Sequence, residues 1–298
     1  MNRLRNNTLR PGLTRLADYW TLTKPEVNLL VLASTLVGFY LAWRGPLDFW
    51  RLAHTLLGTL LVASGTATLN QYFERRSDRL MRRTANRPLP AGRLAPAQAL
   101  AFGLLLAALG GWELWVFANP LASQLAWLTL GAYLACYTPL KKRTPLCTLL
   151  GAVPGAMPPL IGWAAARNSL GAEAWELYAL LFLWQFPHLL AIAWMYREDY
   201  ARAGLRLLPP NDHDGRRTVR SILTYLFLLL PASLLPVFLG QVGKAYLVGA
   251  LLLACGFWHC GMGLARHRSN ASARRLVLAS IVYLPLVFAL MMADKTPL

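Results

Sequence analysis

Long apolar stretches recur along the whole chain and are separated by short charged segments. Each stretch has about the 20 mostly apolar residues that an α-helix needs to cross a bilayer. The expected spans are residues 27–44, 52–72, 96–118, 120–138, 146–165, 174–195, 219–240, 243–265 and 273–292. The pattern predicts an all-α polytopic membrane protein of about nine transmembrane helices. We expect residues 1–298 to form a single membrane-embedded domain, with a basic cytoplasmic tail at residues 1–20.

Composition and charge agree with a membrane protein. Apolar residues make up 56% of the chain and charged residues 14%, well below the quarter or so of a soluble domain. If the N-terminus is cytoplasmic, 25 of the 30 lysines and arginines lie at inner segments, the bias that the positive-inside rule predicts. The net charge of +17 therefore indicates membrane lipid rather than nucleic acid as a partner. Because the N-terminus is short, we expect the protein in the bacterial cytoplasmic (inner) membrane. We expect its N-terminus on the cytoplasmic side.

The first cluster of charges follows the predicted span 52–72. Asn70, Glu74 and Asp78 are four residues apart, so a helix places their oxygen ligands on one face. Such ligands suit Mg²⁺, which often bridges carboxylates and substrate phosphates, and Arg82 and Arg87 are candidates to bind the phosphates. The alternative is a solvated helix end whose arginines only set topology. Asn70 weakens that alternative, because polar groups at the apolar end of a span are usually functional.

A second, comparable cluster follows the predicted span 174–195. Glu198 and Asp199 lie there among arginines that include Arg202, and the two clusters together hold four of only 13 acidic residues. Two acidic clusters can hold two metal ions and one diphosphate between them. Taken alone, the second cluster is a weak signal.

Five stretches carry a family resemblance. They are residues 22–27, 70–92, 137–144, 151–155 and 196–209. On these residues the sequence resembles the intramembrane prenyltransferases and, within them, the branch of the protohaem IX farnesyltransferases. The wider superfamily usually has paired aspartates in both acidic segments. Here Glu74 takes one such place and Tyr200 stands where another acid is expected, a pattern that favours the haem branch and leaves the number of metals open.

The resemblance implies a helical bundle around a central cavity that opens toward the cytoplasmic side. It implies an enzyme that joins farnesyl diphosphate to a vinyl group of haem B, adds water, and gives haem O and diphosphate. Mg²⁺ is the expected cofactor, and haem B is a substrate. The expected metal ligands are Asn70, Glu74, Asp78, Glu198 and Asp199. Neutralising the diphosphate lets the allylic C–O bond ionise, and stabilising the departing oxygens is typically the largest catalytic term.

Other candidates lie near the inner ends of further spans. Tyr137 and Tyr196 are expected to shield or orient the allylic cation, with an aromatic-belt role as the alternative for Tyr137. Lys142 is expected to bind phosphate, or else only to set topology. His188, about two turns before Tyr196, is expected in the haem pocket, and an interhelical hydrogen bond is the alternative.

Two other functions stay open. One is a prenyltransferase that acts on an aromatic or quinone-precursor acceptor. The other is a membrane transporter or lipid-binding protein without chemistry, in which replacing Asp78 or Asp199 changes no turnover. For the haem reaction we also expect a haem-modifying or oxidase-assembly partner.

Overall fold

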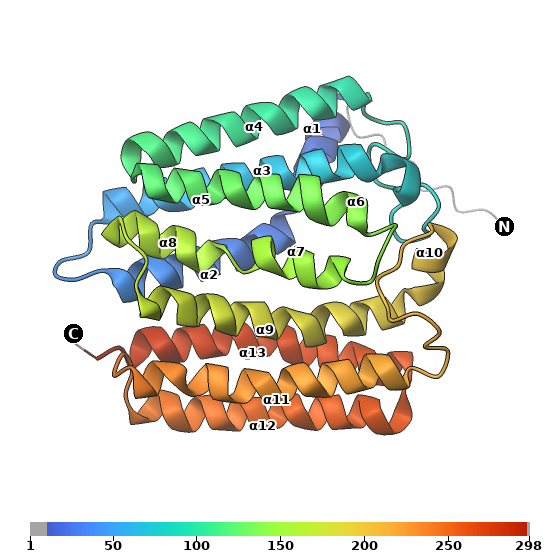
Figure 1. Cartoon of the computed structure of the whole chain (residues 1–298). Coiled ribbons are helices and arrows are strands. Elements are labelled where there is room, and N and C mark those ends of the chain that lie inside the picture. Colours follow the sequence, from blue (N-terminus) through green and yellow to red (C-terminus); the bar gives the residue numbers. More distant parts are fainter. Residues whose placement is uncertain (1–10, 297–298) are drawn as a thin grey trace.

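The structure is a computed structural model that describes residues 11–296. Over that range the chain is almost entirely helical, and the long helices run roughly parallel in one bundle (Figure 1). The elements are α1 (Pro11–Thr23), α2 (Pro25–Ala42), α3 (Phe49–Asp78), α4 (Pro96–Phe117), α5 (Pro120–Gly131), the π-helix η1 (Ala132–Tyr137), α6 (Thr138–Leu140), α7 (Cys147–Gly155), α8 (Pro158–Arg167), α9 (Ala172–Met195), α10 (Arg197–Arg202), α11 (Arg216–Phe238), α12 (Lys244–His267) and α13 (Asn270–Ala293).

The helices agree approximately with the expected nine spans. In the described part of the chain, eight helical stretches are long and apolar enough to cross a membrane. One of them, Cys147–Arg167, consists of α7 and α8 in succession. The predicted span 120–138 is divided among α5, η1 and the start of α6, each too short to span on its own.

Glycine lets two of the central helices approach closely. A Cβ atom at Gly38 of α2 would overlap the backbone of Pro159, and one at Gly162 of α8 would overlap the backbone of Thr35. Small residues at such crossings are typical of helix packing in membranes, where close van der Waals contact drives association. Prolines at the first turn of α8 begin this helix anew after α7, since proline at that position needs no N–H partner.

The helices are arranged around α9. Figure 1 shows α13, α11 and α12 on one side of α9, and α2, α7 and α8 on its other side with α3, α4 and α5 beyond them. α9 contacts α11 and α13 as well as α7 and α8, so it joins the two parts of the bundle. The main apolar core extends through both parts.

The two ends of the bundle differ in charge. The turn after α3, α6 and α10 lie together at one end, which we call the charged end, and α13 finishes at the other (Figure 1). At the far end, Lys295 donates hydrogen bonds to the backbone oxygens of Tyr40 and Trp43. Burial, followed by the positive charges of Arg167 and Arg44, lowers the pKa of Lys295. Arg44, Arg167 and Lys295 therefore lie near one another at the far end, whereas the cytoplasmic orientation of the charged end stays a prediction.

The predicted basic tail contains a helix. Residues 1–10 of this tail lie outside the described residues, but α1 begins at Pro11. Arg93 Nε pairs with Asp18 Oδ1 at 2.9 Å, and Leu22 packs in a small apolar cluster with Leu89. The segment before the first span is thus docked onto the turn that follows α3.

Candidate active site

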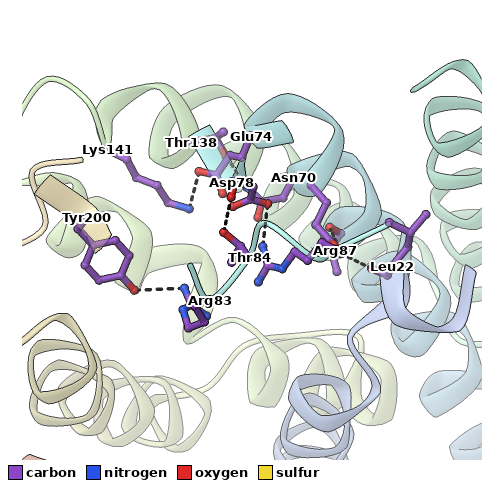
Figure 2. A network of polar contacts seen from close by, with 12 residues as sticks. Leu22, Asn70, Glu74, Asp78, Arg83, Thr84, Arg87, Thr138, Lys141 and Tyr200 are labelled. Atoms are coloured by element: carbon purple, nitrogen blue, oxygen red, sulfur yellow. Dashed lines mark hydrogen bonds and ion pairs between the residues drawn. The ribbon is translucent and has the colours of Figure 1, made fainter. Parts of the chain in front are cut away.

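The long helix α3 carries the first acidic cluster. Its 30 residues end at Asp78, so its last turns reach the charged end of the bundle. Asn70, Glu74 and Asp78 lie on successive turns of one face, and Asn70 and Asp78 are each only 1% exposed. Figure 2 shows the three side chains together, with Lys141 and Arg87 pointing toward them. The local spacing of the sequence therefore builds one polar face in an otherwise apolar surrounding.

Each polar group of this face has a partner from another segment. Lys141 Nζ lies 2.8 Å from Glu74 Oε1, and Arg87 Nη1 lies 2.8 Å from Asp78 Oδ2. The amide nitrogen of Asn70 donates to Thr138 Oγ1 at 3.2 Å. Because these carboxylates are partly or fully removed from water, the paired cations offset a large desolvation cost.

A π-helix precedes the lysine that reaches Glu74. A π-helical turn adds a residue to the helical repeat and is frequent at functional sites. After η1, Lys141 Nζ lies 4.2 Å from the ring centroid of Tyr137 and 5.9 Å from that of Tyr133. A Cβ at Gly151 would overlap the Tyr137 ring, so glycine in α7 makes room for it. Burial works against the charge of Lys141, but the two tyrosines and Glu74 raise its pKa.

The second acidic cluster reaches the first through α10. Asp199 Oδ2 accepts a hydrogen bond from the backbone N–H of Arg83 at 3.2 Å, and Asp199 Oδ1 pairs with Arg202. The Arg83 side chain lies over the Tyr196 ring, 5.1 Å from its centroid, and donates to the Tyr200 hydroxyl at 3.4 Å. Two segments separated by 116 residues thus meet at one end of the bundle.

A lysine before the first span belongs to the same electrostatic environment. Burial, then the positive charges of Arg87 and Lys141, lower the pKa of Lys24 from 10.5 to about 8, while Glu74 and Asp78 raise it. Lys24 has φ of 51°, a left-handed conformation that costs free energy in a non-glycine residue. It precedes a proline, which disfavours helical backbone at the residue before it. The strained turn therefore holds this ammonium group at the charged end.

Known proteins identify the family. The sequence pattern of the UbiA prenyltransferase family matches residues 31–287. The chain belongs to the UbiA prenyltransferase family. The protoheme IX farnesyltransferase of Solibacter usitatus is 50% identical over 287 residues, covering 93% of this chain and 98% of that protein. The protoheme IX farnesyltransferase of Koribacter versatilis is 46% identical over 298 residues, covering 96% of each. The expected resemblance to the intramembrane prenyltransferases is thus confirmed.

Solved structures show that the fold is shared within the UbiA family. A UbiA homolog from Aeropyrum pernix K1 has a TM-score of 0.73 at 20% identity, covering 87% of this chain and 95% of that one. A UbiA homolog from Archaeoglobus fulgidus bound to DMAPP and Mg²⁺ has a TM-score of 0.68 at 15% identity, covering 92% of this chain and 99% of that one. At these identities the likeness concerns the fold.

Three of the predicted site residues in this UbiA-family chain lie away from the network. Arg82, Lys142 and Glu198 are exposed, and their side chains have no hydrogen bond or ion pair among residues 11–296. Lys141, the neighbour of Lys142, is the lysine that contacts Glu74. In the same way Asp199 faces the site and Glu198 does not, because adjacent residues of a helix point in different directions. The structure does not test the roles expected for these three residues, and the exposure of Lys142 and Glu198 leads us to expect small effects when these two are replaced.

His188 lies in the contact between α9 and α13. Its Nδ1 is 2.7 Å from Ser280 Oγ, and its ring stacks on Trp184 at 5.1 Å between centroids. The indole N–H of Trp184 donates to the backbone oxygen of Ser280. This geometry is the interhelical hydrogen bond that we considered as the alternative to a haem-pocket role, which stays a prediction.

The donors fit a magnesium ion that arrives with its substrate. In the described part of the chain, no three His, Cys, Asp or Glu side chains are grouped so that they hold a metal ion by themselves. The network offers carboxylates from Glu74, Asp78 and Asp199, with the amide of Asn70 beside them. Mg²⁺ is usually bound by one or two carboxylates and by substrate phosphates rather than by a complete protein cage.

Proposed function

We propose that this chain transfers a farnesyl group from farnesyl diphosphate to a vinyl group of haem B, with addition of water, and gives haem O and diphosphate. The observation that carries the proposal is the meeting of two acidic clusters at one end of a helical bundle, where Arg83 N–H joins Asp199 to the turn after α3. The choice of donor and acceptor rests on the names of relatives at 50% and 46% identity that cover nearly the whole chain.

The proposed metal is Mg²⁺, held by Glu74, Asp78 and Asp199 with the amide oxygen of Asn70. When bound, Mg²⁺ supplies positive charge beside the diphosphate. Support comes from the type of donor and from a UbiA homolog whose structure contains Mg²⁺ together with DMAPP. The number of metal ions stays open.

The cations of the chain act on the leaving group. Lys141 and Arg87 are bound to Glu74 and Asp78 before substrate arrives, within 2.8 Å of each carboxylate. We propose that both turn from the carboxylates to the phosphate oxygens, and that Lys24 joins them. Charge that develops on these oxygens as the C–O bond breaks is then met by groups already removed from water. One lost donor of this kind raises the barrier by roughly 2.7–4 kcal/mol.

The aromatic residues divide into two roles. Tyr137 lies beside Lys141, and its ring is proposed to shield the allylic cation once the diphosphate leaves. Tyr196 already lies under Arg83, and its proposed role is to position that arginine. The vinyl carbon of haem B then bonds to C1 of the farnesyl group. Water adds its oxygen to the resulting cation next to the porphyrin and releases a proton.

The site geometry alone also fits a prenyltransferase with an aromatic acceptor, so the acceptor needs a direct test. The chain is reconstituted in nanodiscs with Mg²⁺ and farnesyl diphosphate, and given either haem B or 4-hydroxybenzoate. Mass spectrometry of extracted products is expected to show haem O and no prenylated aromatic acid. A prenylated acid without haem O overturns the acceptor, and no prenyl transfer to either overturns the proposal. Asp78→Asn serves as the matched inactive control.

The location is proposed on charge. The charged end contains most of the lysines and arginines, so we propose that it faces the cytoplasm of a bacterium, with the N-terminus inside. A haem-modifying or oxidase-assembly protein is the proposed partner, because haem O is a membrane-bound product that must be passed on.

A further inference from the structure

An open groove lies between α11 and α12, apart from the network described above. Its volume is about 590 Å³. The residues that define it are Arg216, Arg220, Leu223 and Phe227 of α11 with Trp258 of α12 and the following Arg268. Only 33% of the spanning window of α11 and 22% of that of α12 are buried, so both helices lie at the periphery of the bundle. The groove therefore faces the surroundings of the protein rather than its core.

Charge and apolar surface are separated along the axis of this groove. On α11 the four residues follow helical spacing. Arg216 and Arg220 lie at the start of the helix, and Phe227 lies eleven residues after Arg216. α12 runs back from Trp258 toward Arg268, ten residues later. At 1.5 Å per residue each wall is about 15 Å long, half of the roughly 30 Å hydrocarbon core. If the arginines lie at the membrane surface, the aromatic residues Phe227 and Trp258 therefore lie near the middle of the bilayer.

The mouth of the groove is positively charged. Asp214 Oδ2 pairs with Arg216 Nε at 2.9 Å, and its backbone oxygen accepts a hydrogen bond from Arg268 Nη1 at 3.3 Å. The side chain of Arg220 has no hydrogen bond or ion pair within residues 11–296. Of these three guanidinium groups, only that of Arg216 is paired with a carboxylate. An excess of guanidinium groups at the level of lipid headgroups favours an anionic phosphate ester.

We propose that this groove binds one anionic phospholipid. The phosphate contacts Arg220 and Arg268, and one acyl chain lies along Leu223, Phe227 and Trp258. The length of the groove corresponds to one leaflet and fits an acyl chain, whereas a soluble phosphate would contact only the arginines. The positive charge distinguishes an anionic lipid from a zwitterionic one, whose own ammonium group is repelled by the arginines.

The proposal is tested by native mass spectrometry of the whole chain purified in detergent. The probes are dioleoyl phosphatidylglycerol, dioleoyl phosphatidylcholine and glycerol phosphate. The variants are the double substitution Arg220→Gln/Arg268→Gln and a matched control, Arg274→Gln/Arg275→Gln, which removes the same charge from exposed positions of α13. We expect the first pair to weaken phosphatidylglycerol binding about tenfold. The control and wild type should bind phosphatidylglycerol alike and in preference to phosphatidylcholine.

A further variant tests the apolar part of the groove. Phe227 is 64% exposed, so Phe227→Ser should leave folding intact and weaken phosphatidylglycerol binding. The proposal is overturned if the two double variants lose phosphatidylglycerol binding equally, or if neither variant loses it. It is also overturned if glycerol phosphate competes for the groove as well as the lipid does. Dimers that bury the groove, seen as crosslinks from position 227 to a second copy, also overturn it. Thermal unfolding of every variant confirms that any loss is not a folding defect.

Discussion

The two acidic segments reach the same site by different routes. Glu74 and Asp78 belong to a 30-residue helix that is buried along much of its length, whereas Asp199 belongs to α10, which has six residues. The carboxylates of α3 are paired with cations from other segments, Lys141 and Arg87. Asp199 instead accepts a backbone N–H and pairs with an arginine of its own helix.

This difference indicates which changes should affect chemistry and which should affect position. The bundle itself fixes the α3 carboxylates, so replacing one removes a ligand from an otherwise unchanged site. α10 is fixed by contacts such as those of Arg83 with Tyr196 and Tyr200. Replacing such a contact should move Asp199 slightly and leave the ligands present. The following predictions compare the two segments, from the largest expected effect to the smallest.

Removal of an α3 carboxylate should have the largest effect. Asp78→Asn is expected to lower kcat/KM for farnesyl diphosphate by about 10²–10³-fold, since it removes a proposed carboxylate ligand of the Mg²⁺ that would stabilise the leaving group. Glu198→Gln is the matched control in the second segment, and its exposed position predicts a change of less than about twofold. Haem O formation, measured by mass spectrometry, checks both. Equal losses in the two variants would contradict the assignment of metal ligands.

The neighbouring lysines should separate clearly. Lys141→Met leaves Glu74 without its paired cation and removes a positive charge that is proposed to stabilise the leaving diphosphate. We therefore expect kcat/KM to fall by about 10²-fold. Lys142→Met, in the next position but exposed, should change kcat/KM by less than about twofold. If Lys142 proves the more sensitive of the two, the geometry described for Lys141 is wrong. Circular dichroism during heating shows whether either variant is unfolded.

Lys24 predicts a loss of activity at alkaline pH. Burial and neighbouring cations lower its pKa to about 8, so the free protein loses this charge as the pH rises through that value. Because kcat/KM reports the free enzyme, it should fall by about tenfold between pH 7 and pH 9. Arginine keeps its charge over this range. The profile of Lys24→Arg should therefore be flat, and an unchanged alkaline fall in this variant would assign it to another group.

A positioning contact of the second segment should have the smallest effect. Tyr200→Phe removes the hydroxyl that accepts a hydrogen bond from Arg83 and leaves the ring in its apolar cluster. Loss of one such bond corresponds to about fivefold in kcat/KM. Mg²⁺ dependence should stay as in wild type, which a loss of a metal ligand would change. If Tyr200→Phe lost as much activity as Asp78→Asn, the contact between Arg83 and Tyr200 would matter as much as a metal ligand, and the proposed difference between the two segments would be wrong.

Much of the fold follows from local sequence. A span is a property of about 20 consecutive residues, so its existence can be read from composition alone. The same holds for Asn70, Glu74 and Asp78, whose common face needs only a continuous helix. α1 escaped prediction because Pro11–Thr23 is short and has no apolar run of membrane-spanning length.

The rest of the site depends on contacts that are distant in sequence. Lys141 and Lys142 look alike in the chain, and the π-helix with the packing after it decides which one reaches Glu74. Whether Glu198 or Asp199 faces the site is decided by how α10 docks. Lys24 was missed as a site residue, although the proline that follows it was a usable signal of an unusual backbone.

The central claim is that the two segments form one diphosphate site. A double-mutant cycle with Asp78→Asn and Asp199→Asn tests it most directly, with kcat/KM for farnesyl diphosphate measured in nanodiscs. If both carboxylates act on one metal-bound diphosphate, the double variant should be about as impaired as the worse single variant. If the two fold-losses multiply, the carboxylates act independently and the account is contradicted.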